Sequence, residues 1–482
     1  MRRKFIITFI FLTITLIFTS WYTSLKRQAD NEFVRLCGKC NVPQITTALR
    51  SGANPNANAN DTKENTALTA AINSKTNEIM YEILSEVESS DIERLADIVE
   101  EWRLGTVKAL LEAGANPNKP GNHGNLPLTL AAGKGYAGII TALLDGGADI
   151  DAPDKERHTA LAEASKAGHV EAVNTLIKAG ADINAPHEGY TPIMNAAMES
   201  HIGIIDILIS AGANVNATTK YGDSALNCAA LRGHSEAVKT LVNSGANVNV
   251  TDHNGKTPLM FAANADTVNI LLMAGADLHA RDKYGYTALI HAAGRKNPGA
   301  VKALINAGSD VNAKSQYGNT ALIETSRYGK SELITALLNA GADYNVKLSY
   351  NGVNAIIEAS SYGNSEAVKI LLSAGANVND RDNYGKTPLM HAAERWYAAT
   401  VETLIYAGAN VNDRDNYGKT SLMYAAENWR DDTVNALIDL GADVNIKDND
   451  GKKALDYAVM SAEERSYIKH FDTFKRLESL TK

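Results

Sequence analysis

The hydrophobic and polar positions of this chain repeat with a period of about 33 residues along most of its length. One period, at 384–412, reads "YGKTPLMHAAERWYAATVETLIYAGANVN". The apolar spacing in "LMHAA" places Leu389, Ala392 and Ala393 on one face of a short helix. Val401 and Leu404, with Ile405 beside them, follow the same rule in a second helix. The pattern therefore predicts two short helices per period and a polar, extended finger between periods.

Residues at the ends of these segments indicate where each helix begins and ends. Thr387 is a natural N-cap, and Pro388 follows at the first helical position, where a missing N–H is tolerated. Gly408 follows the second helix and suits the left-handed position that ends many helices. Gly385 supplies the positive φ that a tight turn at the finger tip requires. Each module is too small to bury its own apolar face, so it must stack on the next.

Two markers keep the same beat along the chain, which indicates a true repeat. From Gly114 onward, the glycines of the first marker follow one another at nearly constant steps, of which the one from Gly245 is the shortest and the one from Gly341 the longest. The first step, from Gly52 to Gly114, is nearly twice as long and spans two modules. We expect about 14 modules, counting degenerate ends. The triplets Gly-Ala-Asn, Gly-Ala-Asp or Gly-Ser-Asp begin at Gly52, Gly114, Gly147, Gly180, Gly212, Gly245, Gly275, Gly308, Gly341, Gly375, Gly408 and Gly441. The second marker is Thr-Ala-Leu, Thr-Pro-Ile or Thr-Pro-Leu at 66–68, 159–161, 191–193, 257–259, 320–322 and 387–389.

This combination resembles the ankyrin repeat, whose signature runs T-P-L-H-x-A-A, then G-H, L-L and G-A-D-x-N. The resemblance covers residues from about 32 to 460. It implies a mainly α solenoid with a β-hairpin finger and two antiparallel helices in each repeat, and it implies protein–protein interaction. The signature His is absent, and we expect apolar packing to replace its hydrogen bonds. Its place holds Ala162, Met194, Asn227, Met260, Ile290, Met390 and Met423.

The sequence predicts four segments. Residues 1–25 form an N-terminal apolar helix, residues 26–31 a short linker, residues 32–460 the repeat array and residues 461–482 a capping helix. The last segment replaces the second-helix pattern with a charged amphipathic one, as a terminal repeat with a polar outer face should.

The N-terminal segment has the features of a membrane anchor. Residues 2–4 are basic, and residues 5–25 contain 21 consecutive residues without a charge. A helix of that length spans roughly 31 Å, close to the hydrocarbon thickness of about 30 Å. No A-x-A cleavage pattern follows, and Trp21 and Tyr22 suit a membrane interface. We therefore favour an uncleaved signal-anchor over a cleaved signal peptide. Both place the repeats outside the cytoplasm, in a periplasmic or extracellular location.

Composition narrows the function. A net charge of −8 argues against a nucleic-acid partner, and three cysteines are too few for a disulfide scaffold. Cys37 and Cys40 form a C-x-x-C pair, for which helix packing is favoured over an incidental disulfide or redox chemistry. The Gly-Lys-Thr triplets lack the upstream Gly of a phosphate loop, and "DRDNYG" lacks the acidic ligands of a calcium loop. We expect no catalytic residue, metal or cofactor.

Aromatic residues at the surface are the remaining candidates for function. Trp102, Trp396 and Trp429 are predicted to lie in turns between helices. Aromatic residues are favoured anchors of protein interfaces. The alternative is that the tip tyrosines pack against neighbouring fingers. Tyrosine precedes the turn glycine at five predicted finger tips, the candidate partner-binding residues Tyr221, Tyr284, Tyr317, Tyr384 and Tyr417.

These observations favour a non-enzymatic binding solenoid anchored in a membrane through residues 5–25. The chain looks like the ankyrin-repeat proteins that bacteria export, which implies a protein partner. The alternative is a secreted effector, or a toxin-associated or immunity-type protein, released after signal cleavage. An enzyme with the repeats as an accessory lacks room, because only the short segments 1–31 and 461–482 lie outside the predicted array.

Overall fold

The computed structural model describes residues 42–51, 53, 55, 66–72, 89–121, 124–186, 189–428, 431–465 and 471–481. They fall into two compact units, one ending at Lys220 and the other beginning at Tyr221. The membrane segment at 5–25 and the cysteines Cys37 and Cys40 lie outside the described residues. Within the described part, none of the helices combines the length and the apolar character needed to span a bilayer.

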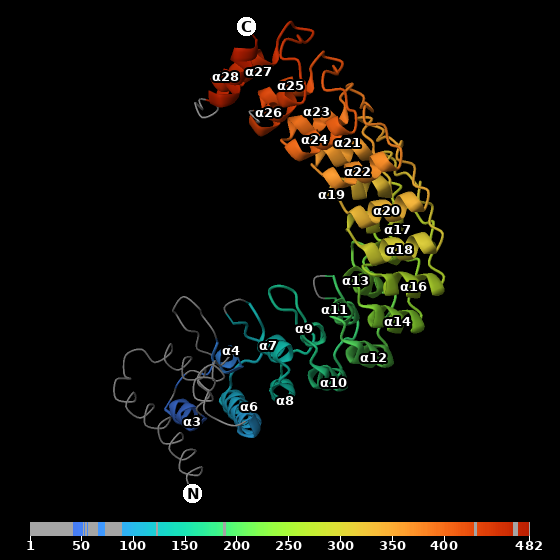
Figure 1. Ribbon diagram of the computed structural model, residues 1–482. Helices are drawn as coiled ribbons and strands as arrows, with labels where there is room; N and C mark the ends of the chain where they lie inside the picture. The colour runs from blue at the N-terminus through green and yellow to red at the C-terminus, as the bar shows by residue number, and fades with distance from the viewer. Residues whose placement is uncertain are drawn as a thin grey trace. The chain divides into compact units, whose positions relative to one another are not determined.

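The first unit contains helices that stack in two layers from α7 onward. Helices α7, α9 and α11 contact one another in sequence, and α6, α8, α10 and α12 form the second layer. Figure 1 shows them in blue to green. Their bounds are α3 Val42–Arg50, α4 Ala67–Ile72, α6 Ser89–Glu112, α7 Pro127–Lys134, α8 Ala137–Asp145, α9 Ala160–Ala167, α10 Val170–Lys178, α11 Pro192–Met198 and α12 Ile202–Ser210.

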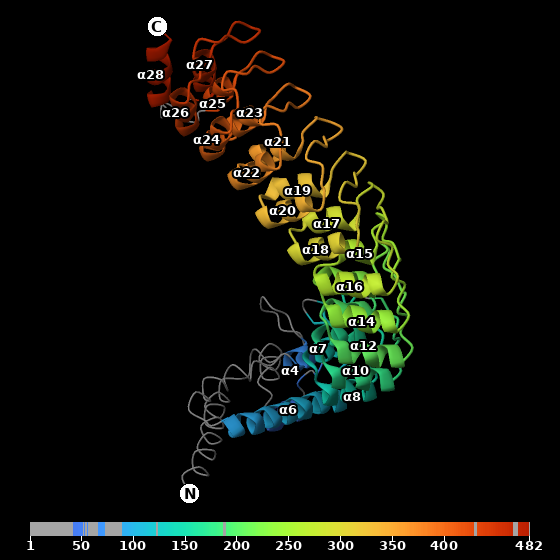
Figure 2. The ribbon, with the colours of Figure 1, turned by 45° about the vertical axis from the view of Figure 1, so that its right-hand side comes forward.

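The second unit continues the helix pairs to the C-terminus. The first helices of its repeats are the odd-numbered α13 to α27, and the second helices are the even-numbered α14 to α28; each layer stacks in order. Figure 2 shows the pairs, with the finger loops extending to one side. Their bounds are α13 Ala225–Arg232, α14 Ser235–Asn243, α15 Pro258–Phe261, α16 Ala265–Met273, α17 Ala288–Gly294, α18 Pro298–Asn306, α19 Ala321–Tyr328, α20 Ser331–Asn339, α21 Ala355–Ser361, α22 Ser365–Ser373, α23 Pro388–Glu394, α24 Ala398–Tyr406, α25 Ser421–Glu427, α26 Asp431–Asp439, α27 Ala454–Arg465 and α28 Phe471–Leu480.

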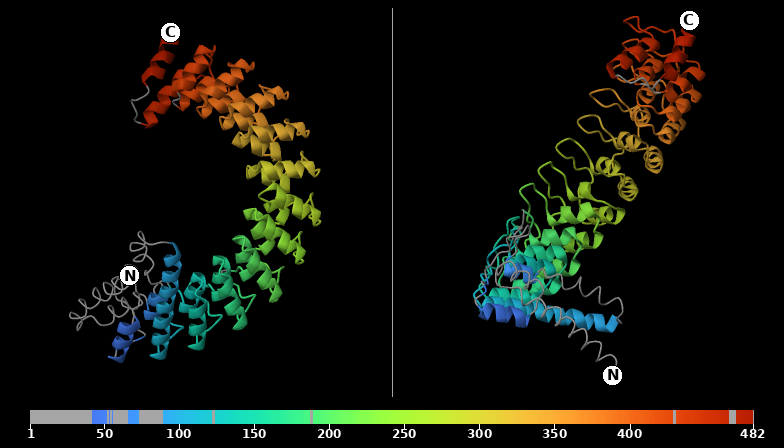
Figure 3. Two further views of the ribbon diagram at one scale, coloured as in Figure 1. Left: turned by 60° about the horizontal axis from the view of Figure 1, so that its bottom comes forward. Right: turned by 90° about the vertical axis from the view of Figure 1, so that its left-hand side faces the viewer.

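The predicted caps and core positions are confirmed in the repeat at 384–412. The Thr387 side chain accepts a hydrogen bond from the Met390 N–H, and Pro388 opens α23. Gly408 lies at φ 92°, just after α24. Leu389, Ala392 and Ala393 are fully buried, as are Val401 and Leu404 of the second helix, whereas Ile405 is half-buried. Figure 3 shows how successive pairs repeat this packing.

Methionine fills the place of the signature His in several repeats. Met194, Met390 and Met423 are buried, and their sulfur atoms lie 3.4 Å from the N–H groups of the preceding cap threonines. Side chains that precede the second helices form hydrogen bonds between repeats. His201, for example, contacts the Lys166 carbonyl at 3.0 Å, and the Asn264 amide donates to the Gly233 carbonyl at 2.7 Å.

The fingers differ from the predicted β-hairpins. Within the described residues there is no β-strand, only single bridge residues. The finger at 382–386 closes as a tight turn, in which Asp382 N–H donates to the Lys386 carbonyl and Gly385 N–H to the Asp382 carbonyl. The tip carbonyls instead accept hydrogen bonds from the next finger, so each finger has too few ladder bonds to form a strand. The hairpin prediction is therefore wrong in its strands.

Two modules depart from the regular pattern. The short step between Gly245 and Gly275 reduces one first helix, α15, to four residues, after which the Asn264 side chain caps α16 by accepting from Thr267 N–H. The long step from Gly52 contains the 24-residue helix α6. Trp102 lies within α6, so its predicted place in a turn is wrong, because one continuous helix occupies that position. Trp429 lies outside the described residues.

The C-terminal segment predicted at 461–482 contains the end of α27 and the whole of α28. Helix α28 contacts both α27 and α26. It therefore takes the position of a second helix in the last repeat. Arg476 of α28 hydrogen-bonds to Asn435 at 2.5 Å and pairs with Asp439, both on α26.

Candidate partner-binding surface

The five predicted tyrosines lie at the tips of fingers in the unit from Tyr221 to Lys482. Their exposed fractions range from 45% at Tyr284 to 59% at Tyr221 and Tyr417. The backbone carbonyl of each accepts a hydrogen bond from the next finger; at Tyr317, for example, the donor is the Ser349 N–H at 2.8 Å. Because these bonds join neighbouring tips, they hold the tyrosines in one row, which we call the tip row.

The structure adds Tyr350 to this row, which the sequence reasoning missed. Its side chain is 64% exposed. The lengthened step from Gly341 to Gly375 inserts one position into this finger, so Asn351 occupies the place before Gly352 and Tyr350 stands just ahead of it. Asn351 still supplies the carbonyl that accepts from the next finger, from Asn383 N–H at 2.8 Å. The lengthening of the period at this finger was the available signal.

Glycine after each tip permits the close approach of neighbouring fingers. A Cβ built on Gly318, which has φ 78°, would lie 2.7 Å from the Lys347 carbonyl oxygen of the next finger. A Cβ on Gly385 would lie 2.9 Å from the backbone nitrogen of Asn416. Any side chain would therefore push the fingers apart and break the bonds between their tips.

A buried aspartate fastens several tips to their first helix. Asp382 Oδ1 accepts from the N–H groups of Tyr384, at 2.9 Å, and Lys386, at 2.8 Å, while Oδ2 lies 3.0 Å from His391 Nε2 on α23. Burial alone would raise the pKa of Asp382, but the hydrogen bonds from His391 and the two backbone N–H groups outweigh it, so the pKa lies below its ordinary value. The tip is thus tied to the packed helix layer.

The same connection recurs with different donors. His291 Nε2 lies 2.9 Å from Asp282 Oδ2, and the Tyr424 hydroxyl donates to Asp415 Oδ2 at 2.6 Å. The Tyr457 hydroxyl donates likewise to Asp448. His291 and His391 stand one position after the place of the signature His, and their role here is to hold the finger. The constant spacing between the donor and its Asp was the signal in the sequence.

A second surface runs along the first helices from α15 to α27, which we call the first-helix strip. Its charged and aromatic residues occupy the same few positions in successive repeats, so they share one face. Lys386, for example, bonds Glu394 at 3.0 Å in its own repeat and lies 4.1 Å from the centroid of the Tyr424 ring in the next. The strip consists of Lys256, Phe261, Arg295, Lys296, Glu324, Arg327, Tyr328, Glu358, Tyr362, Lys386, Glu394, Arg395, Trp396, Lys419, Tyr424, Glu427, Lys452 and Tyr457.

Trp396 alone of the three tryptophans has the predicted place in a turn between helices. It is 59% exposed and has a positive φ of 78°. Tyr221 shows that part of the packing alternative also applies, because its ring meets the His253 ring edge-on at a centroid separation of 6.4 Å. The exposed remainder of each tip side chain stays available to a partner.

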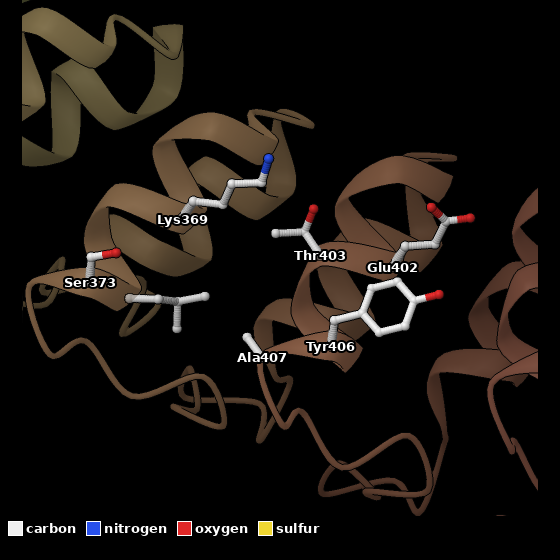
Figure 4. A pocket seen from close by; sticks show the side chains of 7 residues that line it. Lys369, Ser373, Glu402, Thr403, Tyr406 and Ala407 are labelled. Carbon is white, nitrogen blue, oxygen red and sulfur yellow. The ribbon is translucent and has the colours of Figure 1, made fainter.

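Other features of the described chain do not assemble reactive chemistry. No group of three or more His, Cys, Asp or Glu side chains in it is placed to hold a metal. Burial raises the pKa of the Cys228 thiol to about 12, which keeps it protonated at neutral pH. A shallow, open hollow of about 480 Å³ lies between α22 and α24, lined by Lys369, Tyr406 and their neighbours (Figure 4). It is the groove between two adjacent second helices.

Comparison with known families supports the repeat assignment. A family model described as ankyrin repeats in three copies matches residues 95–187, 185–252, 259–348, 345–415 and 397–477. No curated protein matches the chain.

Proposed function

The chain belongs to the ankyrin-repeat family, and from this premise we propose that it is a non-enzymatic scaffold that binds a protein partner through the tip row. Ankyrin repeats mediate protein–protein interactions. The observation that carries the proposal is the row of half-exposed tyrosines on tips that the backbone and buried aspartates hold in place. Rigid aromatic side chains lose little conformational entropy on binding and are frequent interface anchors.

A pull-down from solubilised membranes with the full chain tests this proposal. The test variant replaces Tyr284, Tyr317, Tyr384 and Tyr417 with Ala. We expect it to lose at least about 2 kcal/mol of binding free energy, since one hot-spot residue can contribute that much. The matched control is Met273→Ala with Tyr406→Ala, which removes exposed side chains from the ends of second helices α16 and α24. Retention of the partner by the tyrosine variant, together with a lower melting temperature, would favour the packing alternative.

We also propose that residues 5–25 anchor the chain in a membrane, with the repeats outside the cytoplasm. The support is the run of 21 uncharged residues behind a basic start, without a small-residue cleavage pattern. The experiment is fractionation followed by washing with high salt and with alkali, and we expect the full-length chain to remain in the membrane pellet. A soluble species beginning near residues 21–30 would contradict the anchor and favour the released effector or immunity-type protein.

A further inference from the structure

The first-helix strip is basic although the whole chain is acidic. It carries eight Lys and Arg side chains against four Glu, whereas the net charge of the chain is −8. The four carboxylates already have cationic partners: Arg327 pairs with Glu324 and with Glu358, Lys386 with Glu394, and Lys419 with Glu427. The excess charge of this face is therefore positive and is not cancelled within it.

The remaining cations lie over aromatic rings. Lys256 and Arg295 lie 6.0 and 5.6 Å from the Phe261 centroid, and Lys296 lies 4.2 Å from that of Tyr328. Arg395 and Lys452 are placed in the same way over Tyr362, at 5.4 Å, and Tyr457, at 5.7 Å. Within the described part of the chain, none of these five cations forms a salt bridge with a carboxylate. Each ring holds its cation in place while leaving the charge able to pair with an incoming anion.

Trp396 and Lys296 occupy strained positions on this strip. Both follow the end of a first helix with positive φ, 78° at Trp396 and 61° at Lys296. Glycine fills the equivalent place in other repeats, for example Gly329 at φ 63°. A bulky residue with positive φ is a backbone outlier, and such strain gathers at functional sites. The chain thus places a large exposed aromatic side chain and a cation where the fold would favour glycine.

We infer that the first-helix strip binds an extended acidic peptide segment whose acidic residues alternate with aromatic ones. The inference rests on the proposed scaffold function and names its partner chemistry. Packed helices lie about 8–10 Å apart, and an extended peptide rises about 3.3 Å per residue. One acidic residue in every three would therefore meet one cation per repeat, while aromatic residues between them contact Tyr328, Tyr362 and Trp396.

The four Glu side chains distinguish this partner from a nucleic acid. Cations and aromatic rings together can also bind single strands of nucleic acid. A phosphate backbone carries a charge at every nucleotide and would meet Glu324, Glu358, Glu394 and Glu427 along the strip. A peptide can place neutral residues opposite them, so charge complementarity favours the acidic peptide.

Fluorescence anisotropy with the full chain tests the inference. The probe is a labelled peptide of five Glu-Tyr-Gly repeats; the comparison probes are the matching Gln-Tyr-Gly peptide and an oligothymidylate of the same number of units. We expect the acidic peptide to bind at least about tenfold more tightly than the neutral one, with an affinity that falls as salt rises. Absence of acidic-peptide binding, or equal or tighter binding of the oligothymidylate, would overturn the inference.

Two variants place the peptide on the strip. Trp396→Gly removes the aromatic anchor and relieves the positive φ, so we expect affinity to fall at least about fivefold while the denaturant midpoint stays or rises. Lys296→Glu with Arg395→Glu reverses two unpaired charges and should weaken binding at least about tenfold. The control is Lys239→Glu on second helix α14, which should leave the affinity unchanged. Equal loss in the control, or none in the strip variants, would contradict the site.

The outcome is separable from that of the proposed function. If the synthetic peptide fails to bind while the tyrosine variant still loses its natural partner, the scaffold function stands and the acidic-peptide inference falls. If the strip variants lose the peptide while the tyrosine variant retains its natural partner, the tip row is excluded and the strip remains as the binding face.

Discussion

The hydrogen bond between Tyr424 and Asp415 offers the most informative perturbation of the finger architecture. The Tyr424 hydroxyl donates to Asp415 Oδ2 at 2.6 Å, and both side chains are buried. Oδ1 of the same carboxylate accepts from the N–H groups of Tyr417, at 2.9 Å, and Lys419, at 2.8 Å. Tyr424→Phe keeps the ring and removes only the hydroxyl, so it leaves Oδ2 without its donor.

The expected loss follows from the type of bond. A hydrogen bond to a charged group contributes about 1.5–3 kcal/mol, and a buried acceptor without a donor loses hydration as well. The free energy of opening this finger should therefore fall by about 2 kcal/mol. Tyr424→His is the matched rescue, because His391 reaches Asp382 Oδ2 at 3.0 Å from the equivalent position of α23. It should restore most of the loss.

Amide hydrogen exchange is the suitable assay, because long repeat arrays do not unfold as one cooperative unit. Exchange at the N–H groups of Tyr417 and Lys419 should become roughly 10- to 150-fold faster in Tyr424→Phe, since about 1.4 kcal/mol corresponds to a factor of ten. The next finger, held by Asp448 and Tyr457, is the internal reference and should not change. Unchanged exchange in the Phe variant, or equal acceleration in the His variant, would refute the role of this bond.

Three further predictions test the packing, the buried carboxylate and the thiol. Ala393→Leu should overpack the fully buried layer of first helices and cost about 1–3 kcal/mol, measured as a lower denaturant midpoint; an unchanged midpoint would count against this layer. Because the pKa of Asp382 is lower in the folded state than in the unfolded state, its ionised form adds stability above about pH 4, and this stability is lost as pH falls through the folded-state pKa. Urea midpoints from pH 7 to pH 3 should therefore fall less steeply in Asp382→Asn, and parallel profiles would contradict this. Cys228, with its pKa raised to about 12, should resist a thiol reagent at pH 8 in the folded chain and react after unfolding, as mass spectrometry of its peptide can measure; rapid labelling of the folded chain would contradict its burial.

Local sequence rules were sufficient to predict the helix pairs. The spacing of Leu389, Ala392 and Ala393 identified the buried face of α23, and Thr387 with Pro388 identified its start. The period itself determined the stacking order. These features depend on residues close together in the chain, where helix geometry and capping leave few alternatives.

Features that depend on contacts between repeats could not be predicted in the same way. The finger strands were expected from the family resemblance, but the tip carbonyls bond to the next finger, as at Tyr317 and Ser349. Tyr350 joined the row because an inserted residue shifted its finger. Lys296, which lies over the Tyr328 ring, belongs to the repeat before that ring, so only the stacking of repeats brings the two together.

The central claim is that the tip row binds the partner, and the most direct test is the dissociation constant of the partner recovered in the pull-down. It is measured for the full chain and for the variant with Tyr284, Tyr317, Tyr384 and Tyr417 replaced by Ala, with a melting curve of each. Exposed substitutions usually change stability by less than about 0.5 kcal/mol each. The account predicts affinity at least about 30-fold weaker, corresponding to about 2 kcal/mol, with the melting temperature nearly unchanged. Unchanged affinity per folded molecule with a lowered melting temperature would contradict it.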